Sequence, residues 1–264
     1  MKLPFAQIDA FADRPFTGNP AAVIALDTWL EDAVLQAIAA ENNLSETAFV
    51  VPDASCAADF ELRWFTPAIE VALCGHATLA SGHYLLSADP ARDRVTFATR
   101  RAGMLSVERA ATGYRMALPA YRAEPKPMPE TLAALGFDQA QATLWHPGGY
   151  SLIVLDSADA VIAICPDFHA LTGSEDILTI VTAPGTDTDV VSRVFAPFAG
   201  IDEDPVTGSA HSVLAPYWTE RLGRDTFTAF QASARGGHLT CKLAGEHVIL
   251  GGQCVTVIEG RFQL

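Results

Sequence analysis

Glu46 stands at a place in the chain where a carboxylate could move protons. It follows the mostly polar residues 42–45 and precedes an apolar, strand-like run. A carboxyl group at such a junction can have its pKa raised by burial, which suits proton transfer near neutral pH. The alternative, which the residues themselves leave open, is a solvated glutamate at the start of a strand.

A second candidate is the sequence Cys74-Gly75-His76, which comes directly before an apolar run. A thiol at the N-terminus of a helix is expected to have a lowered pKa. The imidazole of His76 could donate a hydrogen bond to a carboxylate. A buried cysteine beside a capping histidine is the structural alternative for the same three residues.

A third candidate follows the same plan later in the chain. Asp204 and Thr207 precede Gly208, and Ser209 and His211 follow it. The structural alternatives are a turn at Asp204, since a proline comes next, and ordinary helix capping by Ser209. The match with the second candidate favours a functional pair.

The second and third candidates belong to a longer repeat. Each follows an Arg-x-Phe-x-Pro pattern, at residues 63–67 and 193–197, and then an acidic residue, Glu70 in the first copy and Asp204 in the second. An apolar, helix-like run comes after each glycine. Backbone N–H groups at a helix N-terminus are unpaired and the helix dipole favours an anion. The repeat predicts two related halves that hold a small acid.

The two strongest helices are expected directly after the glycines, over residues 77–86 and 210–222. Both runs are apolar nearly all round, which is typical of a buried helix. Pro216 is expected to kink or tighten the second one. A shorter helix is predicted over residues 129–135, closed by Gly136.

Another helix is predicted before Glu46. Thr28 and Glu31 have the spacing of a capping box, an apolar face follows, and Asn42 and Asn43 end the run.

Short alternating runs separated by turn residues make up most of the remaining chain, which is typical of β-strands. One buried helix among many strands, occurring twice, predicts an α+β fold with two pseudo-symmetric, β-barrel-like lobes, each wrapped around a central helix. The proline-rich residues 119–129 are the expected linker, so we place the lobes at residues 1–119 and 120–253.

Composition excludes several classes of partner. The net charge is −14 and no run is rich in lysine and arginine, which argues against nucleic acid. No apolar run approaches the roughly 18 residues of a membrane span. The five cysteines form no C-x-x-C pair, which favours a cytoplasmic protein with free thiols. The histidines lack metal-ligand spacing, so we expect no metal site.

Four ordered motifs, at residues 16–23, 43–49, 65–78 and 195–211, resemble those of the phenazine-biosynthesis isomerase (PhzF-like) family. The resemblance extends over essentially the whole chain. In the first motif, turn structure accounts for the residue types around Asn19, and a ligand contact by its side chain is left open. Residues 235–237 depart from the Gly-Arg-Pro-Gly of many relatives, which leaves the role of that loop open.

The resemblance implies the diaminopimelate epimerase fold, with a ligand cleft between the lobes and the last strand, about residues 254–264, returning to the first lobe. It also implies a cofactor-independent, homodimeric enzyme acting on a small carboxylic acid. The site residues that it implies are Glu46, His76 and Asp204 for catalysis, and Ser45, Gly75, Gly208 and Ser209 for substrate binding.

Epimerases of the same fold use two cysteines, one at each helix start. Here the first position is Cys74 and the second is Thr207, whose hydroxyl cannot act as a thiolate. We therefore expect isomerisation of an unsaturated or cyclic acid by Glu46 alone, as for trans-2,3-dihydro-3-hydroxyanthranilate in the phenazine pathway. The alternatives are an epimerase or racemase that pairs Glu46 with Cys74, and a non-catalytic protein that binds a small acid.

Overall fold

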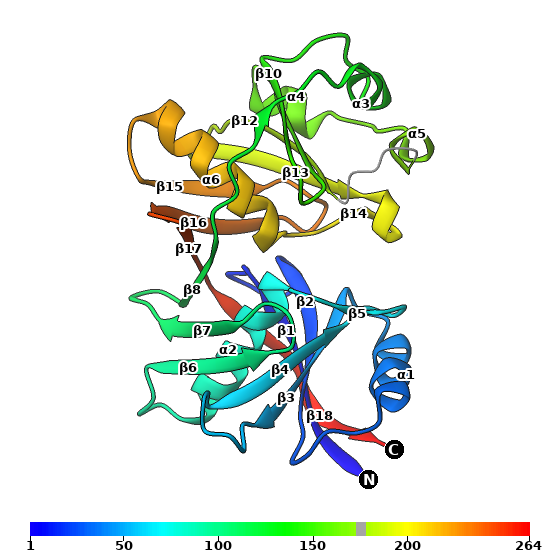
Figure 1. The fold of residues 1–264 in the computed structure, drawn as a ribbon, viewed down its shortest axis with the longest axis vertical. Helices are drawn as coiled ribbons and strands as arrows, with labels where there is room; N and C mark the ends of the chain where they lie inside the picture. Colours follow the sequence, from blue (N-terminus) through cyan, green and yellow to red (C-terminus); the bar gives the residue numbers. More distant parts are fainter. Residues whose placement is uncertain (173–177) are drawn as a thin grey trace. The chain divides into compact units, whose positions relative to one another are not determined.

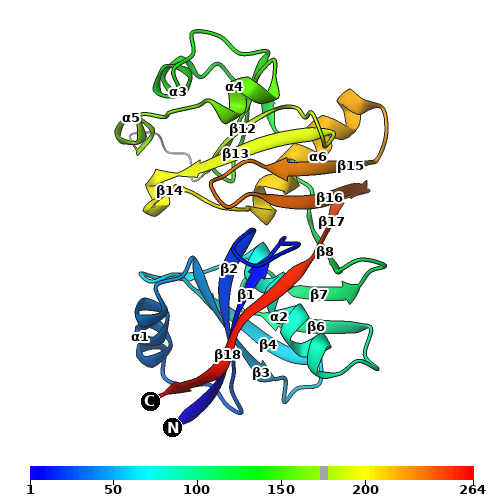
Figure 2. The ribbon, with the colours of Figure 1, turned by 180° about the vertical axis from the view of Figure 1, so that it is seen from behind.

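The chain divides into two compact units, which are described one by one. The computed structural model describes residues 1–172 and 178–264. The first unit consists of Met1–Ala117 and Gly251–Leu264, and the second of Leu118–Leu250. The C-terminal segment thus lies in the first unit with the N-terminus, where β18 (Cys254–Gln263) pairs antiparallel with β1 (Lys2–Ala10) (Figures 1 and 2).

The first unit is built on one mixed sheet. After β18 and β1, its strands in order of pairing are β2 (Asn19–Ala25), β3 (Glu46–Pro52), β4 (Phe60–Phe65), β6 (Arg94–Thr99), β7 (Met104–Arg109) and β8 (Tyr114–Pro119). The pairs β2–β3 and β4–β6 are parallel and the other pairs are antiparallel. A short strand, β5 (Glu70–Val71), pairs antiparallel with β4.

One helix, α2 (Gly75–Ala88), forms the centre of this unit (Figure 2). It packs against β1, β2, β3, β6, β7 and β18. Residues from Gly75 to Gly82 are all buried, because the helix is surrounded by strands rather than by solvent. The expected central helix is therefore present, and it begins at Gly75, two residues before the predicted start.

The second unit repeats this plan. Its strands in order of pairing are β9 (Glu124–Pro125), β10 (Ala142–His146), β11 (Tyr150–Val154), β12 (Leu178–Pro184), β13 (Val190–Ala196), β15 (Thr226–Gln231) and β16 (Gly237–Ala244), and β17 (His247–Gly252) follows. The parallel pairs are β11–β12 and β13–β15, and a short strand, β14 (Ile201–Glu203), pairs antiparallel with β13. The order of parallel and antiparallel pairs is thus the same as in the first unit.

The helix that corresponds to α2 is α6 (Gly208–Leu222), which packs against β11 and β16. The helix continues through Pro216, which lies within it. Gly223, whose backbone has the left-handed conformation, caps its C-terminus. The shorter helices are α3 (Pro129–Ala134), α4 (Ala158–Ile162), α5 (Phe168–Thr172) and the 3-10 turn η1 (Pro197–Ala199). The predicted helix at residues 129–135 is confirmed, with Gly136 at φ +85° after it.

An arginine, buried in the first unit and partly buried in the second, marks the repeated strand. Arg63 on β4 binds both carboxylate oxygens of Glu70, at 2.7 and 2.8 Å. Arg193 on β13 binds both carboxylate oxygens of Glu203, at 2.7 and 3.0 Å. The acidic counterpart of Glu70 is therefore Glu203, and the assignment of Asp204 to that place in the repeat is wrong. The strand pairing agrees, since β5 and β14 carry these two glutamates.

The expected capping box at Thr28 is also wrong. The first helix, α1 (Asp32–Asn42), begins after Glu31, and within the described residues no side chain caps its N-terminus. Asp32 instead accepts a hydrogen bond from Arg63 at 2.8 Å, which ties the first turn to the sheet. The predicted end is confirmed, because Asn43 adopts the left-handed conformation there. Leu35 and Ile38 of α1 pack onto Phe49 and Phe65.

A substitution in α2 should measure how closely the central helix fits its sheet. A Cβ atom at Gly82 would overlap the side chain of Val107 on β7. Although alanine favours helices, we expect Gly82→Ala to lower the free energy of unfolding by about 1–3 kcal/mol, because the close contact must be relieved by moving the helix or the strand. Denaturant unfolding checks this. Gly260→Ala is the control, since a Cβ there meets nothing within 4 Å.

Candidate active site

Three segments that are far apart in the sequence meet at one end of the first unit. Asn19 is the first residue of β2, Glu46 is the first residue of β3, and Gly75 is the first residue of α2. Because β2 and β3 are parallel neighbours, both strands begin at the same edge of the sheet, and α2 packs on both. The expected position of Glu46 at a loop–strand junction is confirmed.

Among these three segments, the closest side-chain contact joins Glu46 and His76. The Glu46 Oε2 atom lies 2.9 Å from His76 Nε2, and both side chains are largely buried, at 13% and 5% exposure. On the other side of the ring, His76 Nδ1 lies 3.2 Å from Asn19 Nδ2. Asn19 Oδ1 in turn accepts a hydrogen bond from Ser45 Oγ at 3.1 Å. The four side chains therefore form one continuous chain of contacts, Ser45–Asn19–His76–Glu46.

Cys74 lies beside this chain of contacts. Its Sγ atom is 3.5 Å from His76 Nδ1, and the residue is the N-cap of α2 in extended conformation. Burial, together with the neighbouring Glu46 carboxylate, raises the pKa of the Cys74 thiol to about 11. The expectation of a lowered pKa at the helix start is wrong, because desolvation outweighs the helix dipole. At neutral pH Cys74 is a thiol.

The charge state of His76 depends on opposing influences. Burial lowers the pKa of His76, whereas negative charge on the Cys74 sulfur and on the Glu46 carboxylate raises it well above the usual histidine value. Because Cys74 is a neutral thiol at pH 7, its share of that rise is absent there. Ligand-type atoms of Glu46, Cys74 and His76 all lie within 4.8 Å of one another, a donor set that would suit zinc. Both ring nitrogens of His76 are already engaged by Glu46 and Asn19. We therefore interpret the cluster as a proton-transfer site.

The second unit carries its own set at the start of α6. Thr207 is the N-cap in extended conformation, as Cys74 is in α2. Its hydroxyl donates to Asp204 Oδ2 at 2.5 Å. The fully buried Gln231 on β15 accepts from the Thr207 backbone N–H at 2.9 Å and donates to the Asp204 carbonyl at 2.8 Å. Gln231 thus fixes both Asp204 and the first turn of α6.

Aromatic side chains lie beside the same turn. Ser209 is hydrogen-bonded to Tyr150, the first residue of β11, and burial raises the pKa of that tyrosine. Tyr121 is stacked on His146 with ring centroids 4.7 Å apart, and its backbone N–H donates to Ser212 of α6. The second set is therefore a helix N-terminus bordered by tyrosine and histidine rings.

His211 is a buried histidine in this helix. Its Nδ1 lies 2.8 Å from the Thr207 carbonyl oxygen, and its Nε2 has no hydrogen-bond partner among the described residues. Thr78 makes the corresponding contact to Cys74 in α2, at 2.6 Å. Burial lowers the pKa of His211 to about 4, so the side chain is neutral at pH 7 and has a structural part in the fold.

The low pKa of His211 predicts a loss of stability in acid. Below pH 6.5 the unfolded chain binds a proton at this histidine, whereas the folded chain binds one only near pH 4. The free energy of unfolding should therefore fall by about 3 kcal/mol as the pH is lowered from 6.5 to about 4. Below that pH, His211 should cause no further change. Urea unfolding across this pH range measures the slope. His211→Gln should flatten it, and His247→Gln, at an exposed histidine, should not.

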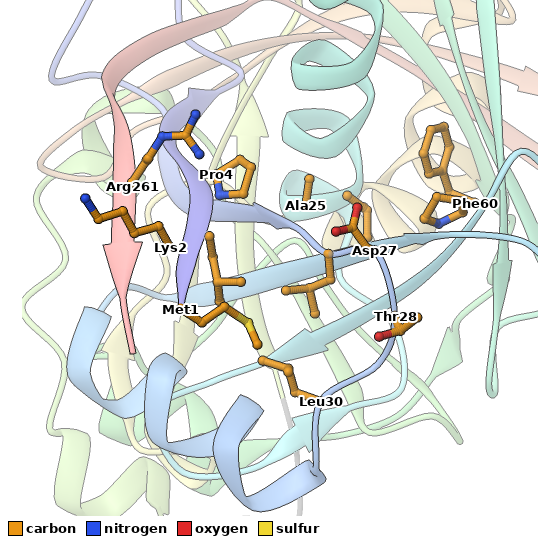
Figure 3. Close-up of a pocket in the computed structure, with 13 residues that line it drawn as sticks. Met1, Lys2, Pro4, Ala25, Asp27, Thr28, Leu30, Phe60 and Arg261 are labelled. Carbon is orange, nitrogen blue, oxygen red and sulfur yellow. The ribbon is translucent and has the colours of Figure 1, made fainter.

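A cavity of about 440 Å³ in the first unit lies apart from these residues (Figure 3). It is bordered by the start of β1 and by the connection between β2 and α1. Its polar lining side chains are Lys2, Asp27, Thr28 and Arg261. This cavity does not coincide with the contacts described above, so the site is identified by those contacts and not by a cavity.

The predicted site residues fall into two groups. Ser45, Glu46, Gly75 and His76 lie together in the first unit, and Asp204, Gly208 and Ser209 lie together in the second. Sequence reasoning left the part of Asn19 open and missed Gln231 and Tyr150. Asn19 lies in the first of the four ordered motifs, residues 16–23, and a polar side chain beside the turn there could have indicated a role in the site. Gln231 lies in an ordinary strand pattern and gave none.

Comparisons with known proteins agree on one family. A model of the phenazine biosynthesis-like protein family matches residues 8–260. An uncharacterized isomerase of Pseudomonas aeruginosa is 48% identical, with all of both chains covered. The crystal structure of a PhzF-family phenazine biosynthesis protein from Enterococcus faecalis is 42% identical and superimposes with a TM-score of 0.93 over all of both chains.

More distant structures share the fold alone. A hydroxyproline epimerase from Agrobacterium vitis is 11% identical and aligns with a TM-score of 0.64 over 98% of this chain and 92% of its own. The expected epimerase-like fold is therefore confirmed. Among residues 1–172 and 178–264, no helix is both long and apolar enough to cross a membrane. The chain belongs to the phenazine biosynthesis-like (PhzF) family and is an isomerase of small molecules.

Proposed function

We propose that this member of the phenazine biosynthesis-like family isomerises a small unsaturated or cyclic carboxylic acid without a cofactor, with Glu46 as the single acid/base. Glu46 takes a proton from one carbon of the substrate and returns a proton to another carbon on the same face. The contact of 2.9 Å between Glu46 Oε2 and His76 Nε2 carries the proposal. It places one carboxylate oxygen against the imidazole ring and leaves the other for the substrate.

The neighbouring groups favour one base over two. Cys74, with a pKa raised to about 11 by burial and by Glu46, holds its proton at neutral pH. At the corresponding helix start, the hydroxyl proton of Thr207 is directed to Asp204. Neither group is available as a thiolate-like base, which two-base epimerisation would need. In the proposed reaction one group exchanges protons with the substrate, whereas two-base epimerisation uses two.

The charge that develops on the substrate needs stabilisation. The N-terminus of α2, which begins at Gly75, presents backbone N–H groups to an anion, and we propose that they bind the carboxylate. We assign the same kind of contact to Gly208 and Ser209 at the start of α6. Asp204, held by Thr207 and Gln231, is proposed to take part in catalysis. A homodimeric assembly remains a prediction for light scattering in solution.

The proposed reaction can be tested by deuterium labelling. The protein is incubated in D₂O, without added cofactor, with trans-2,3-dihydro-3-hydroxyanthranilate and, separately, with trans-4-hydroxy-L-proline as a probe for epimerisation. NMR should show deuterium at a new C–H position of the unsaturated acid and no inversion of the amino acid. Deuterium at the α-carbon of the amino acid, with inversion, would instead identify an epimerase. Binding without exchange of either acid would favour a non-catalytic protein.

A further inference from the structure

Asn19 lies between two of the proposed site residues and is fully buried. It is the first residue of β2, next to the start of β3, where Glu46 is located. Its side chain contacts Ser45 through Oδ1 at 3.1 Å and His76 through Nδ2 at 3.2 Å. The amide therefore joins the loop before β3 to the first turn of α2.

The amide oxygen of Asn19 faces Ser45, and its NH₂ group faces His76. The Ser45 hydroxyl donates to Asn19 Oδ1, so the NH₂ group is turned toward His76. An amide NH₂ group can only donate a hydrogen bond. His76 Nδ1 must then be the acceptor and carries no proton. In a neutral imidazole the proton is therefore on Nε2, the atom that faces Glu46.

We infer that Asn19 is a positioning residue that keeps the single proton of His76 on Nε2, the ring nitrogen that faces the Glu46 carboxylate. This inference rests on the proposed function, because it gives Asn19 a part in the same proton transfer. A ring without a proton on Nδ1 holds and orients the base but does not act as a second acid. Asn19 thereby makes Glu46 the one group that exchanges protons with the substrate.

The charges around the ring show why this contact is needed. Glu46 faces His76 from β3 and favours a doubly protonated imidazolium ion. Cys74 faces it from the start of α2, but its thiol is neutral at pH 7. Asn19 faces it from β2 and opposes a second proton, since an N–H group on Nδ1 would point at the amide N–H groups. Replacing the amide by a carboxylate would remove this opposition and add an acceptor in its place.

The first test needs no variant. The protein is labelled with ¹⁵N-histidine, and the His76 signals are assigned by their absence from the spectrum of His76→Gln. At neutral pH we expect His76 Nδ1 to have the ¹⁵N shift of an unprotonated ring nitrogen and Nε2 that of a protonated one. A protonated Nδ1, whether in the other tautomer or in the imidazolium ion, would overturn the inference.

The second test changes the amide to a carboxylate. In Asn19→Asp, His76 Nδ1 should become protonated at neutral pH, because a carboxylate accepts where the amide donated. An imidazolium ion beside Glu46 makes that carboxylate a weaker base, so deuterium exchange into the unsaturated acid should slow by roughly ten- to a hundredfold. The dependence of the exchange rate on pH should shift with the His76 titration. Asn43→Asp, the same change at an exposed helix end, should alter neither.

The two readouts separate this inference from the proposed function. If wild-type His76 shows the expected nitrogen shifts but no acid exchanges deuterium, the proposed reaction fails and the positioning of His76 by Asn19 stands. If exchange occurs and Asn19→Asp changes neither the nitrogen shifts nor the pH dependence, the positioning role fails and the reaction stands.

Discussion

Replacing Glu46 by glutamine should lower the rate of isomerisation by roughly 10²- to 10⁴-fold, which is the usual contribution of a positioned acid/base. The substitution preserves size and keeps an oxygen atom facing His76 Nε2. It removes the one property that the reaction needs, the ability to take up a proton. Steady-state kinetics with the unsaturated acid would measure the loss, which should appear in kcat.

Binding of the acid should survive the same substitution. Calorimetric titration of Glu46→Gln should give a dissociation constant within a few fold of that of the wild type, because the proposed carboxylate contacts come from backbone N–H groups at Gly75. Glu41→Gln is the matched control, since Glu41 is exposed at the end of α1. If Glu46→Gln were to impair binding and leave the turnover of bound substrate unchanged, Glu46 would be a ligand-binding residue and not the base.

Replacing Gln231 by leucine should have the largest effect in the second unit. The buried amide satisfies the backbone N–H of Thr207 and the backbone carbonyl of Asp204. Leucine fills the same space and leaves both groups buried without these partners, at a cost of about 2–4 kcal/mol in the free energy of unfolding. The hold on Asp204 and on the start of α6 would be lost as well. We therefore expect a lower kcat in addition to a lower denaturant midpoint.

A matched control separates these effects from a general effect of leucine. Gln253 is exposed, so Gln253→Leu should change neither the denaturant midpoint nor kcat. Gln231→Glu keeps an acceptor for Thr207 and loses the donor to the Asp204 carbonyl, so it should be less impaired than Gln231→Leu. Equal stability of the wild type and Gln231→Leu would show that these hydrogen bonds do not hold the helix start.

The sequence predicted the parts of the fold that depend on local pattern. The two glycine-opened helices, the position of Glu46 at the start of a strand and the duplication of Arg63 and Arg193 are all readable from spacing. They are readable because a buried helix must be apolar all round and because the repeat preserves the residues that pair. The family resemblance then indicated Glu46 and His76, which the fold brings within 2.9 Å of each other.

What the sequence missed depends on partners that are distant along the chain. The acidic partner of Arg193 was assigned to Asp204, yet the preceding residue, Glu203 on β14, binds it. Cys74 looked like an activated thiol, but the enclosing sheet removes the solvent on which a lowered pKa depends. Asn19 looked like part of a turn, because its contact with His76 joins residues 57 positions apart.

Glu46 is the single acid/base of the proposed mechanism, and one labelling measurement tests this most directly. Wild type, Glu46→Gln and Cys74→Ala are each incubated with trans-2,3-dihydro-3-hydroxyanthranilate in D₂O, and deuterium incorporation is followed by NMR. We predict that Glu46→Gln slows incorporation by roughly 10²- to 10⁴-fold and that Cys74→Ala retains it, because the Cys74 thiol keeps its proton at neutral pH. Incorporation that persists unchanged in Glu46→Gln, or that disappears in Cys74→Ala, would contradict the single-base mechanism.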